Sequence, residues 1–262
     1  MADEIDYEII GNDMQIVEIE LDPEEAVQAE AGAMAYMGPG IQMQTSMGNE
    51  GSGLFGGLKK GLKRALTGES FFITSFVQKG SGKGHVAFAA PYPGKIIPLD
   101  LTKFGGGLLC QKDSFLCAAR GVEIEVAFTR KLGVGFFGGE GFILQRLKGD
   151  GLAFLHIGGT VIRKDLAVGE TYRVDTGCVA AFTETVTYDI TWSKNFKNAL
   201  FGGEGVVLAT LTGPGTVYMQ SLPFSRLADR IFAASAFGNR EEQNGVAGTG
   251  ILGGLIGGDR SF

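Results

Sequence analysis

Short runs of alternating hydrophobic and polar residues dominate this chain. Residues 6–20 alternate on both sides of Gly11-Asn12-Asp13, a turn signal, and therefore predict a β-hairpin. Farther along, Val122, Ile124 and Val126 alternate with glutamates, which predicts a half-buried strand with these three side chains on one face. Apolar runs of this length, separated by glycine turns at short intervals, are typical of all-β folds.

The pattern recurs along the chain. Residues 138–151 read GGEGFILQRLKGDG and residues 202–215 read GGEGVVLATLTGPG, and residues 68–82 carry a fainter copy. Repetition over such a length indicates one β-rich module used three times. We therefore expect a single β domain over residues 1–239, a pseudo-threefold β-prism or β-helix, with repeats at about 27–101, 115–166 and 174–231.

Three segments depart from the strand pattern. Residues 54–66 place leucines at i, i+4 spacing opposite lysine and arginine, which predicts a short amphipathic helix. Residues 224–237 predict a closing helix. Residues 240–262 are too rich in glycine for a stable helix and predict a flexible tail.

The amphipathic helix has two interpretations. Its apolar stripe either docks on the β domain or lies at an anionic membrane surface or a protein partner, with the basic side chains toward the lipid headgroups. The second interpretation assigns the contact to Leu54, Phe55, Leu58, Lys59, Lys60, Leu62, Lys63 and Arg64.

Composition narrows the class of protein. Glycine is frequent, with 43 of 262 residues, as expected for many tight turns. The net charge of −6 argues against a nucleic-acid partner, because such proteins gain affinity by neutralising phosphates. Residues 1–8 are acidic, unlike a basic targeting segment, and no apolar stretch reaches the length of a membrane span. These features predict a cytoplasmic protein.

The chain offers no constellation for catalysis. His85 and His156 are the only histidines, and their positions match no cupin-type metal site. We expect both to be hydrogen-bonded strand or turn residues. Cys110, Cys117 and Cys178 lack metal-binding spacing and are expected to be buried thiols. The prediction is a protein that is not an enzyme and that uses no metal or other cofactor.

Acidic residues recur with the repeats and have two interpretations. Under threefold pseudosymmetry they would form two carboxylate rings able to bind a cation or a basic partner. The simpler interpretation, which we favour, is structural, because each glutamate precedes a strand and aspartate commonly bonds to its own turn backbone. The residues concerned are Glu69, Glu140 and Glu204, and Asp100, Asp165 and Asp229.

Several blocks together resemble a known family. They are AEAGAM at 29–34, LFGGLKK at 54–60, FFGGEG at 136–141, LFGGEG at 200–205 and the glycine-rich tail. Over about residues 10–258 the chain is similar to the altered-inheritance-of-mitochondria family. The resemblance implies a fold similar to the tryptophan RNA-binding attenuation protein (TRAP-like), akin to a short double-stranded β-helix, and it implies homo-oligomers. It brings no catalytic residues, and the acidic charge argues against transferring RNA binding.

Two functions are compatible with these observations. The first is a non-enzymatic, oligomeric scaffold or interaction protein, with peripheral membrane contact through residues 54–66. The alternative is a small-ligand or carbohydrate-binding β module, which predicts a concave pocket lined by aromatic residues such as Trp192, Tyr188 or Tyr92.

Overall fold

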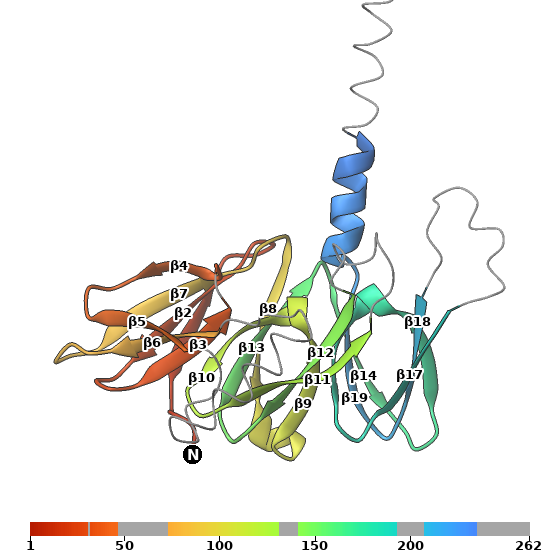
Figure 1. The fold of residues 1–262 in the computed structure, drawn as a ribbon, viewed down its shortest axis with the longest axis horizontal. Coiled ribbons are helices and arrows are strands. Elements are labelled where there is room, and N and C mark those ends of the chain that lie inside the picture. The colour runs from red at the N-terminus through yellow and green to blue at the C-terminus, as the bar shows by residue number, and fades with distance from the viewer. Residues whose placement is uncertain (31, 47–72, 131–140, 193–206, 235–262) are drawn as a thin grey trace, which may run out of the picture. The chain divides into compact units, whose positions relative to one another are not determined.

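The chain folds mainly into antiparallel β-sheets, as a computed structural model shows (Figure 1). The structure describes residues 1–30, 32–46, 73–130, 141–192 and 207–234. It divides into one unit of Met1–Phe224 and a second of Ser225–Phe262. Residues 224–234 are helical, so the predicted all-β class with a C-terminal helix is confirmed. The predicted helix at 54–66 and the predicted tail at 240–262 lie outside the described residues.

Within the described residues, the first unit contains the strands and three short 3-10 turns. The strands are β1 (Asp6–Ile10), β2 (Ile16–Leu21), β3 (Ala26–Glu30), β4 (Met34–Met37), β5 (Ile41–Ser46), β6 (Ile73–Gln78), β7 (Gly84–Ala89), β8 (Gly94–Asp100), β9 (Gly107–Gln111), β10 (Phe115–Ala119), β11 (Glu123–Arg130), β12 (Phe142–Lys148), β13 (Leu152–Gly158), β14 (Val161–Leu166), β15 (Thr171–Asp175), β16 (Val179–Thr183), β17 (Thr187–Trp192), β18 (Val207–Thr212) and β19 (Gly215–Gln220). The turns are η1 (Leu101–Phe104), η2 (Lys112–Ser114) and η4 (Thr176–Cys178).

The sheets follow one strand order. One six-stranded sheet runs β5–β6–β3–β10–β13–β8, and a second runs β11–β12–β9–β16–β19–β14, so every strand number is six higher in the second. The two smaller sheets carry the halves of that order. In the sheet β1–β2–β7–β4, the strands β4–β7–β2 have numbers six lower than the strands β10–β13–β8 of the first six-stranded sheet. The strands of the sheet β15–β18–β17 have numbers six higher than the strands β9–β12–β11 of the second six-stranded sheet.

Two junctions join the halves of the six-stranded sheets. We call the pairing of β3 with β10 the first junction and the pairing of β9 with β16 the second junction. In both, the strand that follows the junction pairs onward with a register shift, between Phe115 and Cys117 on β10 and between Val179 and Ala181 on β16. Such β-bulges bend the strand and increase its twist.

The bulges allow residues of the two sheets to be matched. Cys117 lies opposite Phe154, and Ala181 lies opposite Tyr218. Two residues farther along these partner strands, His156 of β13 and Gln220 of β19 therefore occupy corresponding positions.

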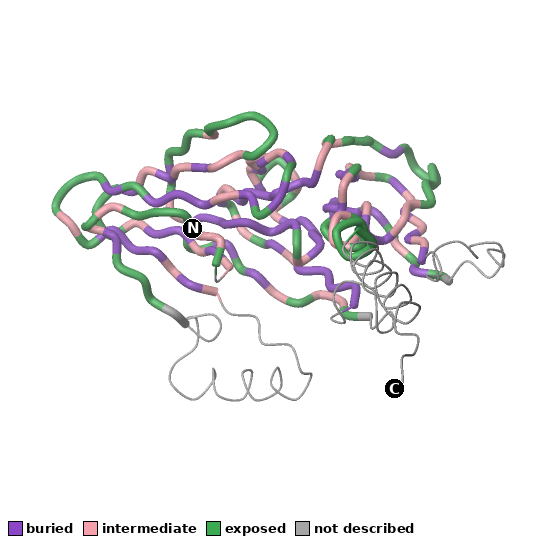
Figure 2. The backbone as a smooth tube through the Cα atoms, turned by 90° about the horizontal axis from the view of Figure 1, so that it is seen from above, coloured by how far each residue is buried: buried purple, intermediate pink, exposed green. Residues whose placement is uncertain are grey.

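Three hydrophobic clusters hold the sheets together. The first joins the β1–β2–β7–β4 sheet to the six-stranded sheet that begins with β5 and ends with β8, through residues such as Ile19, Phe88 and Phe76. The second joins the two six-stranded sheets to each other. The third joins the six-stranded sheet that begins with β11 and ends with β14 to the β15–β18–β17 sheet. Figure 2 shows buried residues following the strands and exposed ones at the loops. Because both faces of the six-stranded sheets are covered, every residue of β10 and of β16 is buried.

The alternating segments behave largely as predicted. The predicted hairpin is confirmed, since β1 pairs antiparallel with β2 across residues 11–15. Of the three residues predicted to share one face, Val122 and Ile124 are buried, whereas Val126 is 39% exposed. The register shift between Val126 and Phe128 on β11 ends the simple alternation at that point.

Candidate ligand-binding pocket

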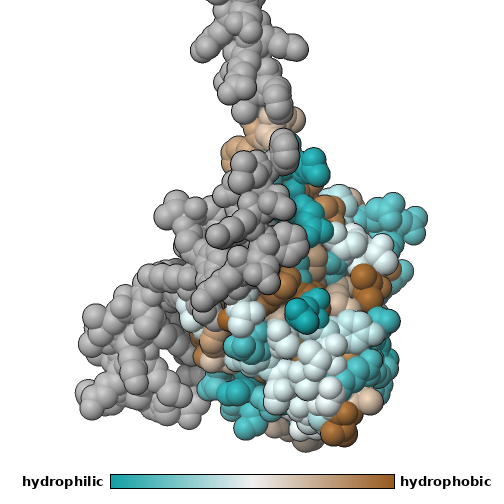
Figure 3. All heavy atoms as spheres, turned by 90° about the vertical axis from the view of Figure 1, so that its right-hand side faces the viewer, coloured by the Kyte–Doolittle hydropathy of each residue, from teal (hydrophilic) through white to brown (hydrophobic). Residues whose placement is uncertain are grey.

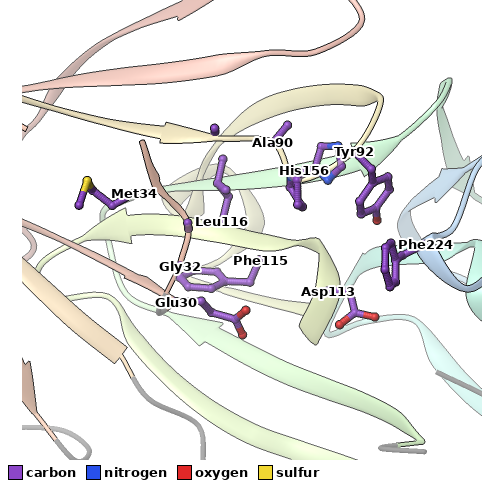
Figure 4. Close-up of a pocket in the computed structure, with 13 residues that line it drawn as sticks. Glu30, Gly32, Met34, Ala90, Tyr92, Asp113, Phe115, Leu116, His156 and Phe224 are labelled. Atoms are coloured by element: carbon purple, nitrogen blue, oxygen red, sulfur yellow. The ribbon is translucent and has the colours of Figure 1, made fainter. Parts of the chain in front are cut away.

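A cavity of about 410 Å³ opens beside the first junction of the first unit. Its walls come from the end of β3, from β4, β7, β10 and β13, and from the loop between β7 and β8. The volume lies in the range of small-molecule sites. The principal apolar and aromatic lining residues are Met34, Tyr92, Phe115, Leu116 and Phe224 (Figure 4).

Two buried polar side chains line this pocket. His156 is 1% exposed and Tyr92 is 5% exposed. Their rings meet edge to face with centroids 4.4 Å apart, and the Tyr92 ring also lies 5.5 Å from that of Phe224. Within the described residues, neither ring nitrogen of His156 nor the hydroxyl of Tyr92 makes a hydrogen bond of good geometry. Such unpaired buried groups are rare, because each loses its hydration without compensation.

Burial controls the ionisation of both side chains. It lowers the pKa of His156 to about 4, opposed only by a nearby backbone group of Tyr92, so the imidazole is neutral at pH 7. Burial also raises the pKa of the Tyr92 hydroxyl, and the negative charge of Asp113 raises it further, opposed by a backbone group of Phe224. At neutral pH the pair therefore presents an uncharged imidazole, with one donor and one acceptor, and a phenol.

Two glycines allow this pair to sit where it does. A Cβ on Gly94 would lie 2.5 Å from Nε2 of His156. A Cβ on Gly158 would lie 2.7 Å from Cε2 of Tyr92 and would clash with the carbonyl oxygen of Leu222. The absence of a side chain at both positions leaves room for the imidazole and the phenol ring.

Carboxylates supply the charge in the pocket. Glu30 at the end of β3 and Asp113 in η2 both line it, whereas no lysine or arginine does so among the described residues. Figure 4 shows the hydroxyl of Tyr92 pointing toward Phe224, with the carboxylate of Asp113 on the same side. The site therefore combines two carboxylates with aromatic rings.

The corresponding position beside the second junction is filled differently. Gln220 accepts a hydrogen bond from the backbone N–H of Gly158 at 3.0 Å and donates one to the carbonyl of Gly177 at 2.8 Å. Both groups of this buried amide are thus satisfied by backbone, whereas those of His156 are not.

Comparison with known proteins places the chain in a family. Residues 7–222 match the family described as Mitochondrial biogenesis AIM24. The chain belongs to this family. A relative in it, an uncharacterized protein of Streptococcus pyogenes serotype M6, is 31% identical over 215 residues, which cover 81% of this chain and 84% of the relative. The crystal structure of another Streptococcus pyogenes protein has the same fold, with a TM-score of 0.68 at 24% identity over 88% of this chain and all of that one.

The structure places some of the predicted site residues of this AIM24-family chain. Asp100 accepts hydrogen bonds from the hydroxyl of Thr102 at 2.5 Å and from its backbone N–H at 3.0 Å, and Asp165 accepts one from the hydroxyl of Thr216 at 2.6 Å. These hydrogen bonds lower the pKa of both carboxyls. Asp229 is exposed in the helix of the second unit. The remaining predicted residues, Glu69, Glu140, Glu204 and the contact residues from Leu54 to Arg64, lie outside the described residues.

The predicted aromatic residues separate in the structure. Tyr92 lines the pocket, but Tyr188 instead packs against Phe128 and Phe182, with ring centroids 5.6 and 5.3 Å away. Trp192 ends β17, and its side chain lies outside what the structure describes. His156, predicted to be hydrogen-bonded, is the residue that sequence reasoning misjudged, while His85 lies on β7 with its ring nitrogens 3.6 and 3.7 Å from Glu18 and Glu20.

Three further features of the described residues bear on the kind of site they can form. Across the described ranges, no group of three histidine, cysteine or acidic side chains is placed to hold a metal ion. Cys110 and Cys117 are fully buried as predicted, and Cys178 is half-buried. No helix among the residues that the structure describes is long and apolar enough to cross a bilayer.

Proposed function

We propose that this AIM24-family chain is a non-enzymatic scaffold whose copies assemble head to tail, with β15 of one copy pairing with β4 of the next. The single observation that carries the proposal is the strand order of the two smaller sheets. If the two smaller sheets of neighbouring copies join at these edges, the combined order is β17–β18–β15–β4–β7–β2. Each six-stranded sheet has the same order once the strand numbers are shifted by six or twelve. Within the described residues, β15 pairs only with β18 and β4 only with β7.

The exposure of the two edges supports this pairing. By analogy with the internal junctions, Tyr36 and Met37 of β4 correspond to Cys117 and Ala118 of β10, and Tyr172 of β15 corresponds to Leu108 of β9. The internal residues are fully buried. Their counterparts are 45, 39 and 37% exposed for Tyr36, Met37 and Tyr172. Large apolar side chains on an open strand edge favour association with another strand.

The contact would be heterologous, because different edges meet. Such interfaces generate closed rings when the rotation closes and filaments when it does not. Figure 3 views the side where β17 and β18 lie in Figure 1, and on its uncovered part hydrophobic residues stand among polar ones.

We also propose that the body is a threefold internal repeat of the TRAP-like, β-prism type. The support is the regular shift of six strands and the similar bulges at β4, β10 and β16. In this proposal the open ends of the first and third repeats are the surfaces through which copies meet. Peripheral membrane contact through residues 54–66 stays a prediction, which salt-sensitive binding of anionic liposomes tests.

Light scattering behind size exclusion tests the assembly. The full chain is expected to elute as one species of at least twice its 27.7 kDa mass. Met37→Lys and Tyr172→Asp should each reduce the mass of this species, because each would bury an unpaired charge at the contact. Met43→Lys is the matched control, because Met43 is 49% exposed on β5, an edge strand outside the proposed contact.

Mixing the two variants tests the head-to-tail geometry. Met37→Lys leaves the β15 edge intact, and Tyr172→Asp leaves the β4 edge intact. Equal amounts should therefore form a dimer, although neither variant assembles alone. A monomeric wild-type chain, or wild-type assembly retained by both variants, would overturn the proposal. Dimers formed by either variant alone would also do so, since they require like edges to meet.

A further inference from the structure

We propose that the pocket beside the first junction binds a small organic amine in its protonated form, with an apolar arm against Leu116 and Met34. This binding function is separate from the proposed assembly, because the pocket is built entirely from residues of one unit of one copy. Two independent features point to it, the unpaired polar groups in the wall and the charge of the lining.

The unpaired polar groups indicate that something is missing from the pocket. His156 and Tyr92 are each more than nine-tenths buried and line a cavity, and their polar atoms make no hydrogen bond of good geometry among the described residues. At the corresponding position, Gln220 makes two hydrogen bonds to backbone groups. The fold can therefore satisfy a polar side chain there, whereas His156 lines the pocket and has no such pair of backbone bonds. A ligand that bonds to His156 and Tyr92 would remove the cost of their burial.

The charge of the lining selects the ligand class. Glu30 and Asp113 bring carboxylates, and no lysine or arginine lines the cavity within the described residues. The neutral imidazole and the phenol oxygen can each accept a hydrogen bond, and an ammonium group has only donors. The rings of Tyr92, Phe115 and Phe224 add the favourable interaction of a cation with aromatic faces. An anionic ligand could accept hydrogen bonds from the imidazole and the phenol, but it would be repelled by the two carboxylates.

The two histidines make a sharp experiment possible. The full chain, labelled with ¹⁵N-histidine, has only His85 and His156 to report. Three probes of similar shape are titrated at low salt: 2-phenylethylamine, the uncharged 2-phenylethanol and the anionic 3-phenylpropionate. The amine is expected to bind most tightly. Because His156 lines the pocket, the amine should also shift the imidazole signals of this residue. The signals of His85, on the exposed β7 surface, should stay in place.

Variants in matched pairs locate the site. Asp113→Asn should weaken amine binding about fivefold, the size expected for an exposed ion pair, and Asp189→Asn on β17 should not. His156→Leu should weaken it at least about tenfold through lost hydrogen bonding, whereas His85→Leu should leave it unchanged. Asp113 is exposed, so its variant keeps the test valid if His156→Leu fails to fold.

The outcomes separate this proposal from the scaffold. Amine binding that is retained in monomeric Met37→Lys and weakened by Asp113→Asn supports the pocket whatever the assembly proves to be. Absence of binding by all three probes would overturn the ligand site and leave the assembly proposal intact. Equal or tighter binding of 2-phenylethanol or 3-phenylpropionate would overturn the assignment to a cation.

Discussion

The two internal junctions of this fold share their strand order but differ beside the bulged strand. Next to the second junction, the amide of Gln220 is bonded to the backbone at Gly158 and Gly177. Next to the first, the imidazole of His156 has no such partner and borders a cavity of about 410 Å³. The Gln220 site is completed by backbone hydrogen bonds within the fold. The His156 site retains unbonded polar groups next to a cavity. The difference separates a position that stabilises the fold from one suited to binding.

The largest effect is expected at Gly158, which serves both sites. Its N–H bonds to Gln220, and a Cβ at this position would collide with Leu222 and Tyr92. Gly158→Ala should lower the free energy of unfolding by at least about 3 kcal/mol, because the clash involves backbone. Gly82→Ala, where a Cβ would meet open space, is the control in chemical denaturation and should change little. Equal stability of the two variants would show that the close approach is not constraining.

The next effect is expected at Gln220. Gln220→Leu leaves the N–H of Gly158 and the carbonyl of Gly177 buried without their partner. The free energy of unfolding should fall by about 2 kcal/mol, the cost of unpaired buried groups. Urea denaturation measures it. If this variant is as stable as the wild type, the contrast between the junctions has no energetic basis.

The dependence of stability on pH sharpens the contrast further. The folded-state pKa of His156 is about 4, below its unfolded value of 6.5. Between these values the unfolded chain binds a proton that the folded chain does not, so stability is greatest above pH 6.5 and declines as the pH falls toward 4. The slope should not exceed about 1.4 kcal/mol per pH unit. His156→Leu should remove this contribution, and an unchanged profile would show that the imidazole is not desolvated.

The smallest effect is expected from His156→Leu at pH 7. Replacing an unpaired buried imidazole by an apolar side chain should raise the free energy of unfolding by about 1 kcal/mol, the reverse of Gln220→Leu. Thermal unfolding of the two variants side by side checks the opposite signs. A loss of stability in both would mean that His156 is a framework residue like Gln220.

Much of the fold follows from local pattern, and the pocket depends on register. The alternation around Gly11 and the helical segment from residue 224 are readable because a short hairpin and a single helix need only local information. The aromatic pocket was foreseen at Tyr92 but not at His156. The match between His156 and Gln220 appears only once the bulges at Cys117 and Ala181 are counted, and a bulge leaves no clear mark in a run of small apolar residues.

The pairing of strands also gives each junction a chemical reporter. Cys117 lies opposite Ala29 at the first junction, and Cys110 lies opposite Ala181 at the second. Burial raises the pKa of both thiols, so alkylating reagents can reach a thiolate only when the surrounding strands separate. The rates of modification of these two cysteines would therefore measure how often each junction opens locally. Both rates can be compared within a single unlabelled chain.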